Sequence, residues 1–338
     1  MGKRIGNQTI QMDMKPSIEF TTSVVGPKEG AGPLSEYFDI ILTDDTNGQD
    51  SFEKAESSMM NRAIVETISK AQLEDKDVNY IFGGDLLNQL TASHFAIRDI
   101  DIPFFGLYGA CSTMTESLSL ASLMVEAGFA TNVIATTSSH FSSSERQFRF
   151  PLEYGAQRKV TSQWTVTGAG AMLVSNKKTK GKPVVTFVTT GKVKDYDITD
   201  VNNMGAAMVP AAVDTLKAHF EDTGKQPSDY DLIATGDLGS VGGDLMVKLM
   251  KEYGYDISKN YIDCGDQIYI KDNTVCAGGS GCGCSAVVDC GYIYKEMLKK
   301  KFKKVLLMST GALMSTTSSL QGESIPGIAH AVALEMEW

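Results

Sequence analysis

The chain has 338 residues, of which 42% are hydrophobic and 21% charged, with 32 glycines and a formal net charge of −10. This composition is typical of a soluble globular α/β protein and excludes a disordered chain. The acidic balance argues against nucleic acid as a general partner, because phosphate binding needs a basic surface. No transmembrane helix or signal peptide is expected, since no stretch reaches about 18 uninterrupted apolar residues and the first residues lack an apolar core.

The first half of the chain shows a helix followed by a strand, twice. Met60, Ile64 and Ile68 follow helical spacing and lead to the strand 80–82, which ends in Gly84-Asp85-Leu86. Leu118, Ala121 and Val125 then lie on one face of a second helix, before the strand 133–136 and the apolar stretch 168–174.

The second half repeats this plan after a polar stretch from Ser175 to Pro183. Val213, Leu216 and Phe220 lead to the strand 232–234, which ends in Gly236-Asp237-Leu238. A helix through Val287, Tyr292 and Met297 precedes the strands 305–308 and 329–334.

This duplication predicts an α/β fold with two similar halves, 1–180 and 181–338. Repeated βαβ units build parallel sheets that are covered by helices. A fused pair of such units predicts a five-layer αβαβα arrangement with pseudo-twofold symmetry.

Cys111 lies where an apolar run breaks at Gly109-Ala110 and a polar helix begins. The free N–H groups of a helix N-terminus stabilise a thiolate and receive anions, so we expect a lowered pKa for this thiol. Gly109 is expected to take a positive φ and sharpen the turn. The alternative is a small core residue, since free cysteines are often buried.

The counterpart of this elbow in the second half is the Gly-rich segment 277–285, and the two elbows are expected to wall one cleft. Five of the six cysteines lie between Cys264 and Cys290, but they lack paired C-x-x-C spacing. We therefore expect free thiols that pack as small side chains, and neither a metal site nor a cofactor.

Among the four histidines, His219 is expected to be exposed on a polar helix, and His94 suggests no role. His140 follows the strand 133–136, and His330 lies on the last strand. Each is expected to face the Cys111 cleft, with a structural histidine as the alternative.

The cysteine elbow on this plan resembles the thiolase-like superfamily of thiolases and ketoacyl synthases. In those enzymes the elbow cysteine is acylated, and downstream His, or His and Asn, polarise the thioester carbonyl. Here Asp237 and Ser280 stand at the corresponding positions. An aspartate would repel the developing negative charge, so we expect no condensing activity.

A more specific resemblance covers the chain nearly end to end. The segments 25–29, 84–89, 109–113, 138–140, 145–151, 277–282 and 323–330 resemble the stage V sporulation protein AD family. That resemblance implies a non-catalytic thiolase-like protein that binds dipicolinic acid (pyridine-2,6-dicarboxylic acid), alone or as its calcium chelate. It also implies that the protein works in the SpoVA apparatus, beside membrane-embedded SpoVA proteins and peripheral to the spore inner membrane. The apparatus takes up dipicolinic acid during sporulation and releases it at germination. A homodimer is expected by analogy with thiolase-like folds.

A flat dianion needs cationic or N–H donors at both ends. Cys111, Ser112 and Thr113 are expected to hold one carboxylate at the helix N-terminus. Arg146 and Arg149 are expected to hold the other, unless they pair with acidic side chains instead. The expected ligand-binding residues are Cys111, Ser112, Thr113, His140, Arg146, Arg149, Asp237, Gly279, Ser280 and His330.

Two alternatives to this function remain open: an acyltransferase that still uses Cys111, and an architectural subunit with a vestigial cleft. The lysine-rich run from Lys295 to Lys304 also has two readings. It is either a solvated helix end, which we favour, or a patch for anionic lipid.

Overall fold

The two halves of the protein repeat one strand order. The structure, a computed structural model, describes residues 2–148 and 158–337. Across the first sheet the order is β6-β5-β7-β9-β3, and across the second it is β12-β11-β14-β15-β10, and antiparallel pairing of β10 with β3 at one point joins the two into a continuous 13-stranded sheet. The strands of the first sheet are β3 (Ser17–Val25), β5 (Tyr80–Gly84), β6 (Phe104–Gly106), β7 (Asn132–Ser139) and β9 (Gly168–Ser175). Those of the second are β10 (Pro183–Thr189), β11 (Leu232–Gly236), β12 (Tyr261–Asp263), β14 (Lys304–Ala312) and β15 (Gly327–Met336).

Both sheets are mixed, so the expectation of purely parallel sheets is wrong. β5 runs parallel to β6 and β7, and β11 runs parallel to β12 and β14. The next strand of each half, β9 or β15, is antiparallel to its neighbours on both sides. The polar stretch that divides the sequence connects β9 to β10.

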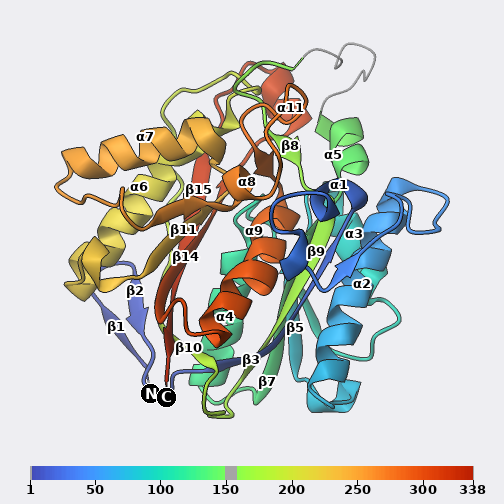
Figure 1. Cartoon of the computed structure of the whole chain (residues 1–338), viewed down its shortest axis with the longest axis vertical. Helices are drawn as coiled ribbons and strands as arrows, with labels where there is room; N and C mark the ends of the chain where they lie inside the picture. Colours follow the sequence, from blue (N-terminus) through green and yellow to red (C-terminus); the bar gives the residue numbers. More distant parts are fainter. Residues whose placement is uncertain (1, 149–157, 338) are drawn as a thin grey trace.

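Helices complete five layers, as predicted (Figure 1). α2 (Phe52–Lys70) and α3 (Thr91–Ile97) cover the outer face of the first sheet, and α6 (Met204–Thr223) and α7 (Gly239–Glu252) cover that of the second. Between the sheets lie α4 (Thr113–Glu126) and α9 (Cys282–Val288), and α4 contacts strands of both. The αβαβα arrangement is therefore confirmed.

The predicted apolar positions are buried, and the helix ends have clear local causes. Met60, Ile64 and Ile68 of α2 are buried, and the Ser51 side chain caps this helix by accepting a hydrogen bond from the Lys54 N–H. α6 ends at Gly224, whose φ of 70° is the left-handed conformation that favours glycine.

One prediction about a helical residue is wrong. His219 on α6 is fully buried, because its ring nitrogens hydrogen-bond to the Thr189 and Tyr230 hydroxyls at 2.8 and 2.6 Å. The helix predicted through Val287, Tyr292 and Met297 is confirmed, with a π-helical turn at Asp289–Ile293 between α9 and α10 (Tyr294–Leu298).

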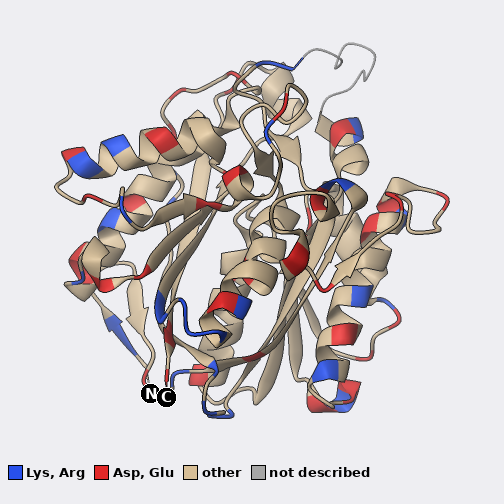
Figure 2. Ribbon diagram, viewed as in Figure 1, with Lys and Arg blue, Asp and Glu red and all other residues tan. Residues whose placement is uncertain are grey.

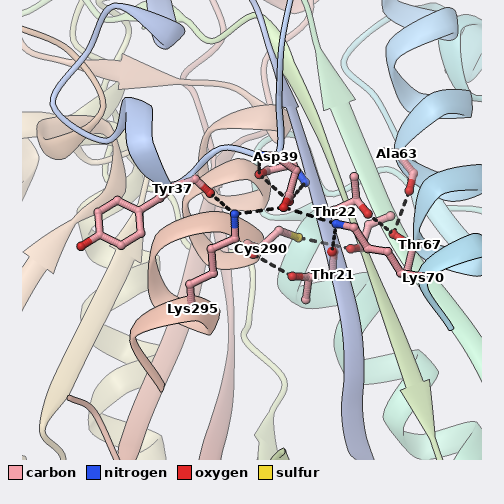
Figure 3. A network of polar contacts seen from close by, with 11 residues as sticks. Thr21, Thr22, Tyr37, Asp39, Ala63, Thr67, Lys70, Cys290 and Lys295 are labelled. Atoms are coloured by element: carbon pink, nitrogen blue, oxygen red, sulfur yellow. Dashed lines mark hydrogen bonds and ion pairs between the residues drawn. The ribbon is translucent and has the colours of Figure 1, made fainter. Parts of the chain in front are cut away.

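Asp39 connects the outer and middle layers (Figure 3). Its carboxylate pairs with Lys70 of α2 at 3.3 Å and with Lys295 of α10 at 2.9 Å. Lys295 also donates to the Tyr37 carbonyl at 2.6 Å. The first lysine of the basic run is therefore part of an internal network.

Smaller elements complete the fold, and charged side chains of both signs lie mostly on the outer helices and loops (Figure 2). β1 and β2 form an N-terminal hairpin, and β2 pairs with β10 of the second half. The remaining elements are β1 (Lys3–Ile5), β2 (Thr9–Gln11), α1 (Pro27–Gly30), β4 (Ile40–Ile41), α5 (Phe141–Phe148), β8 (Trp164–Thr165), α8 (Cys264–Gln267), β13 (Gly279–Ser280) and α11 (Thr316–Leu320).

Candidate functional site

A cavity of about 90 Å³ lies beside Cys111, and both halves of the chain line it. Leu86, Phe148, Met204 and Met314 contribute apolar wall, and Ser280 comes from the second elbow. A water molecule needs about 10–15 Å³ on this measure, so the cavity has room for a small molecule. The structure thus brings Cys111 and Ser280 together, as the duplication predicted.

The Cys111 elbow is a strained turn, but the strain is at a different residue from the one expected. Ala110, and not Gly109, has a positive φ, of 49°. Gly109 is needed for space, because a Cβ there would lie 2.5 Å from Glu116 Oε2 and 2.6 Å from Ser112 Oγ. The prediction of positive φ at Gly109 is therefore wrong.

The hydroxyls of Ser112 and Thr113 hold the turn together. Ser112 Oγ donates to the Gly109 carbonyl at 2.7 Å, and Thr113 Oγ1 donates to the Ala110 carbonyl at 2.6 Å. Their backbone N–H groups donate to the same two carbonyls at 3.1 and 3.2 Å. The groups that were expected to hold a carboxylate are thus engaged within the elbow.

The thiol of Cys111 is neutral at physiological pH. Burial raises its pKa well above the ordinary value, and the nearby Asp237 carboxyl raises it further, while the Gly281 N–H offsets this only in part. The expected lowering of this pKa by the helix N-terminus is therefore wrong. A thiol is a far weaker nucleophile than a thiolate.

Asp237 is fully buried after β11, with a φ of 75°. Neither of its carboxyl oxygens makes a hydrogen bond of good geometry to a described residue, although the Gly281 N–H and the Cys284 thiol lie close enough to lower its pKa in part. Burial raises its pKa well above the usual range, and the Asp263 and Asp289 carboxyls add to this. The raised pKa favours the neutral carboxyl, which can donate a hydrogen bond, over the negative charge that we expected here.

The second elbow closes the cavity from the other side. Gly279 and Ser280 form β13, which pairs in parallel with β8. The backbone carbonyl of Gly279 accepts a hydrogen bond from the Gln163 side chain at 3.0 Å. Gly281 has a φ of 106°, and a Cβ there would lie 2.6 Å from Ser139 Oγ, so glycine is required.

His140 does not face the cavity, contrary to expectation. Its Nδ1 accepts from the Ser142 N–H at 3.1 Å, and its Nε2 donates to the Asp45 carbonyl at 2.7 Å. Burial lowers its pKa, which favours this neutral form. His140 is thus held in a structural role away from the described cavity wall.

His330 and Arg146 also lie away from the described cavity wall. His330 Nδ1 accepts from the Gly191 N–H at 3.3 Å, and burial lowers its pKa to about 4. Arg146 is 57% exposed and pairs with Glu53. The alternative reading, an ion pair, thus holds for Arg146, whereas Arg149 lies outside the described residues.

Two features of the site have no sequence signal of their own. Arg158 pairs with Glu145 at 2.6 Å, with both side chains at most 12% exposed, and lies over the Trp164 ring at 4.8 Å from its centroid. Gln163 lines the cavity and connects the second elbow to the end of β11, since it also donates to the Asp237 carbonyl at 2.6 Å. Only the spatial pairing of β8 with β13 reveals these contacts.

Over residues 2–148 and 158–337, no group of three or more His, Cys, Asp or Glu side chains could hold a metal ion. All six cysteines are free, and Cys282 and Cys290 donate to backbone carbonyls. No helix in the described part of the chain has the length and apolar character needed to cross a membrane.

The fold is similar to that of solved condensing enzymes. An OleA variant of Xanthomonas campestris matches with a TM-score of 0.62 at 13% identity, covering 96% of this chain and 99% of that one. The 3-oxoacyl-(acyl carrier protein) synthase III, FabH, of Xanthomonas oryzae matches with a TM-score of 0.60 at 12% identity, covering 96% and 99%. At this identity the likeness shows the thiolase-like fold alone.

The sequence matches are far more specific. The chain is 43% identical over 333 residues to the stage V sporulation protein AD of Bacillus subtilis, covering 98% of each. The family model for stage V sporulation protein AD matches residues 6–335. The chain therefore belongs to the stage V sporulation protein AD family of sporulation proteins.

Proposed function

We propose that this protein is a non-catalytic dipicolinic acid-binding subunit of the SpoVA apparatus, which takes up dipicolinate in sporulation and releases it at germination. The observation that carries the proposal is the 43% identity to a stage V sporulation protein AD over 98% of both chains. The ligand is the one that the family resemblance implies.

The cavity supports a small ligand with apolar faces and polar edges. Leu86, Phe148 and Met204 offer surface for a flat ring, and Ser280 and Gln163 offer polar groups.

The site residues also support a loss of catalysis. Thioester chemistry needs a thiolate, and burial keeps the Cys111 thiol protonated. It also needs downstream His, or His and Asn, to stabilise the oxyanion, and Asp237 and Ser280 replace them here.

Calorimetry tests the ligand directly. Dipicolinate titrated into the protein should give saturable heat, and picolinate, which lacks one carboxylate, should bind at least about tenfold more weakly. The proposal is contradicted if neither compound gives heat while an unchanged melting temperature shows that the protein is folded.

The second candidate is an acyltransferase that uses Cys111, which the location of this thiol in a cavity on a condensing-enzyme fold favours. Intact-mass measurement after incubation with acyl-CoA distinguishes the two. An acyl adduct that disappears in Cys111→Ser supports the transferase, and an unchanged mass supports the binding subunit.

We further propose that the protein functions as a peripheral protein at the spore inner membrane, beside SpoVA membrane proteins. Several lysines of the basic run have carboxylate partners, which reduces the free positive charge available to anionic lipid and supports contact through protein instead. Lys299 and Lys301 each pair with Glu296 at 2.9 Å, and Lys304 pairs with Glu335 at 3.5 Å. Charge reversal of five lysines around Phe302 should therefore leave sedimentation with anionic liposomes unchanged.

The proposed homodimer forms along β6, the edge strand of the first sheet. Phe105 is 50% and Tyr108 45% exposed at this edge, so apolar surface is available for a second copy. Light scattering of Phe105→Asp should show a monomer if this edge forms the dimer.

A further inference from the structure

Three side chains that line the Cys111 cavity each have a buried polar atom without a partner. Ser144, Ser162 and Gln163 are 3%, 4% and 6% exposed. Ser144 Oγ, Ser162 Oγ and Gln163 Oε1 make no hydrogen bond to any described residue. Buried polar atoms in native proteins are nearly always paired, so three exceptions around one cavity indicate a bound ligand.

The orientation of the Gln163 amide is fixed by its neighbours. Its Nε2 donates to the Asp237 carbonyl at 2.6 Å and to the Gly279 carbonyl at 3.0 Å. A flipped amide would place the side-chain oxygen against two carbonyl oxygens, which cannot donate. Gln163 Oε1 is therefore a buried acceptor on a side chain that lines the cavity, and only a hydrogen-bond donor can satisfy it.

No unpaired charged side chain lies in the described wall of the cavity. Glu145 is the one charged side chain of the described lining, and it pairs with Arg158 at 2.6 Å. The described lining contains no lysine or arginine. The two serine hydroxyls can each donate or accept, so they adapt to the ligand, whereas Gln163 cannot.

We propose that Ser144, Ser162 and Gln163 form an uncharged anchoring site and that the ligand presents a hydrogen-bond donor to Gln163 Oε1. The chemical class is a carboxylic acid in its O–H form or a primary amide. The inference rests on the proposed function for the choice of probe, and with dipicolinate it means that one carboxyl binds protonated.

An amide analogue separates this site from an ordinary dianion site. Dipicolinate is ionised at pH 7 and must take up a proton to donate, whereas 6-carbamoylpyridine-2-carboxylate carries its N–H donor already. We expect calorimetry at pH 7 to show at least about tenfold tighter binding of the amide to the wild-type protein.

Variants test the same contact through the ratio of the affinity for the amide to the affinity for dipicolinate. Gln163→Met keeps the side-chain length without an acceptor and should bring the amide-to-dipicolinate affinity ratio close to one, whatever it does to stability. Ser144→Ala and Ser162→Ala should each weaken binding of the amide by about threefold to tenfold. Ser143→Ala is the matched control, because the Ser143 hydroxyl is bound to Glu56 at 2.8 Å, and it should leave both affinities unchanged.

The outcomes are distinguishable from those of the proposed function. Dipicolinate that binds as tightly as the amide, with an unchanged ratio in Gln163→Met, overturns this inference and leaves the proposed function standing. Heat from neither compound overturns both.

Discussion

Asp85 and Asp237 stand at matching positions of the two halves, each after a Gly-Gly or Thr-Gly strand end, yet their surroundings are opposite. Asp85 follows β5 and accepts hydrogen bonds from the N–H groups of Leu87 and Ser93, both at 2.8 Å, and from the Ser93 hydroxyl at 2.5 Å. Asp237 follows β11, and neither of its carboxyl oxygens makes a hydrogen bond of good geometry to a described residue, with only the Gly281 N–H and the Cys284 thiol nearby.

The difference separates a copy of the motif whose carboxyl is fully hydrogen-bonded from a copy whose carboxyl is not. A buried carboxyl that satisfies three donors stabilises its own loop. A buried carboxyl without partners costs stability, and such a cost persists in proteins mainly at functional sites. Asp85 thus serves as an internal control for Asp237, because it shows how the motif is bonded when it only supports the fold.

The largest expected effect is on the structural copy. Asp85→Ala leaves two N–H groups and one hydroxyl unpaired in a buried loop, so the free energy of unfolding should fall by about 3 kcal/mol. Asp237→Asn at pH 5.5 should change it by less than about 1 kcal/mol, because asparagine tolerates the positive φ and resembles the neutral acid. Urea denaturation measures both, and equal losses would remove the contrast.

The same contrast exists between neighbouring serines of α5. Ser143 donates to buried Glu56, so Ser143→Ala should destabilise the protein by about 2 kcal/mol. Ser144 has an unpartnered hydroxyl, so Ser144→Ala should change stability by less than about 0.5 kcal/mol. Thermal melting of the pair checks this, and a reversed order would show that Ser144 supports the fold.

The pH dependence of stability sharpens the contrast at Asp237. Its pKa is raised in the folded protein, so its contribution is complete below the unfolded value of about 4 and is lost as the pH rises toward the folded value. Above about pH 4 this group lowers the free energy of unfolding by up to about 1.4 kcal/mol per pH unit.

Asp237→Asn should remove that slope, so the variant should gain stability relative to wild type between pH 5.5 and 7.5. The difference in unfolding free energy between the variant and the wild type cancels the contributions of His219 and His330. Their lowered pKa values change stability with pH in the opposite direction. A difference that stays constant with pH would mean that Asp237 is ionised in the folded protein.

The smallest expected effect concerns the elbow thiol. Cys111 is 7% exposed and has a raised pKa, whereas Cys276 is half-buried. Iodoacetamide at pH 8 should therefore alkylate Cys111 at least about tenfold more slowly than Cys276. Peptide mass spectrometry measures both rates, and a Cys111 that reacts first would restore the reactive nucleophile.

The sequence was sufficient to predict the five layers, because helical and strand periodicities are local and appear twice. Buried faces such as Met60, Ile64 and Ile68 follow directly from their spacing. It also located the two elbows, since glycines mark sharp turns between a strand and a helix.

The partners of polar side chains could not be predicted in the same way, because they depend on contacts between distant segments. Ser112 and Thr113 bond to their own turn, and His140 bonds to the Asp45 carbonyl. Gln163 reaches Gly279 of the second elbow only because β8 pairs with β13, more than a hundred residues further along the chain. Hydroxyls and amides have the same appearance in a sequence whether they are paired or free.

The N-terminal hairpin has a consequence for how the chain folds during its synthesis. β2 pairs with β10, so Thr9, Ile10 and Gln11 bond to residues 187–189, which leave the ribosome much later. The first strands to be made must therefore wait for the second half before they can pair. A fragment of residues 181–338 would expose the β10 edge that β2 covers, so the two halves should fold as one cooperative unit.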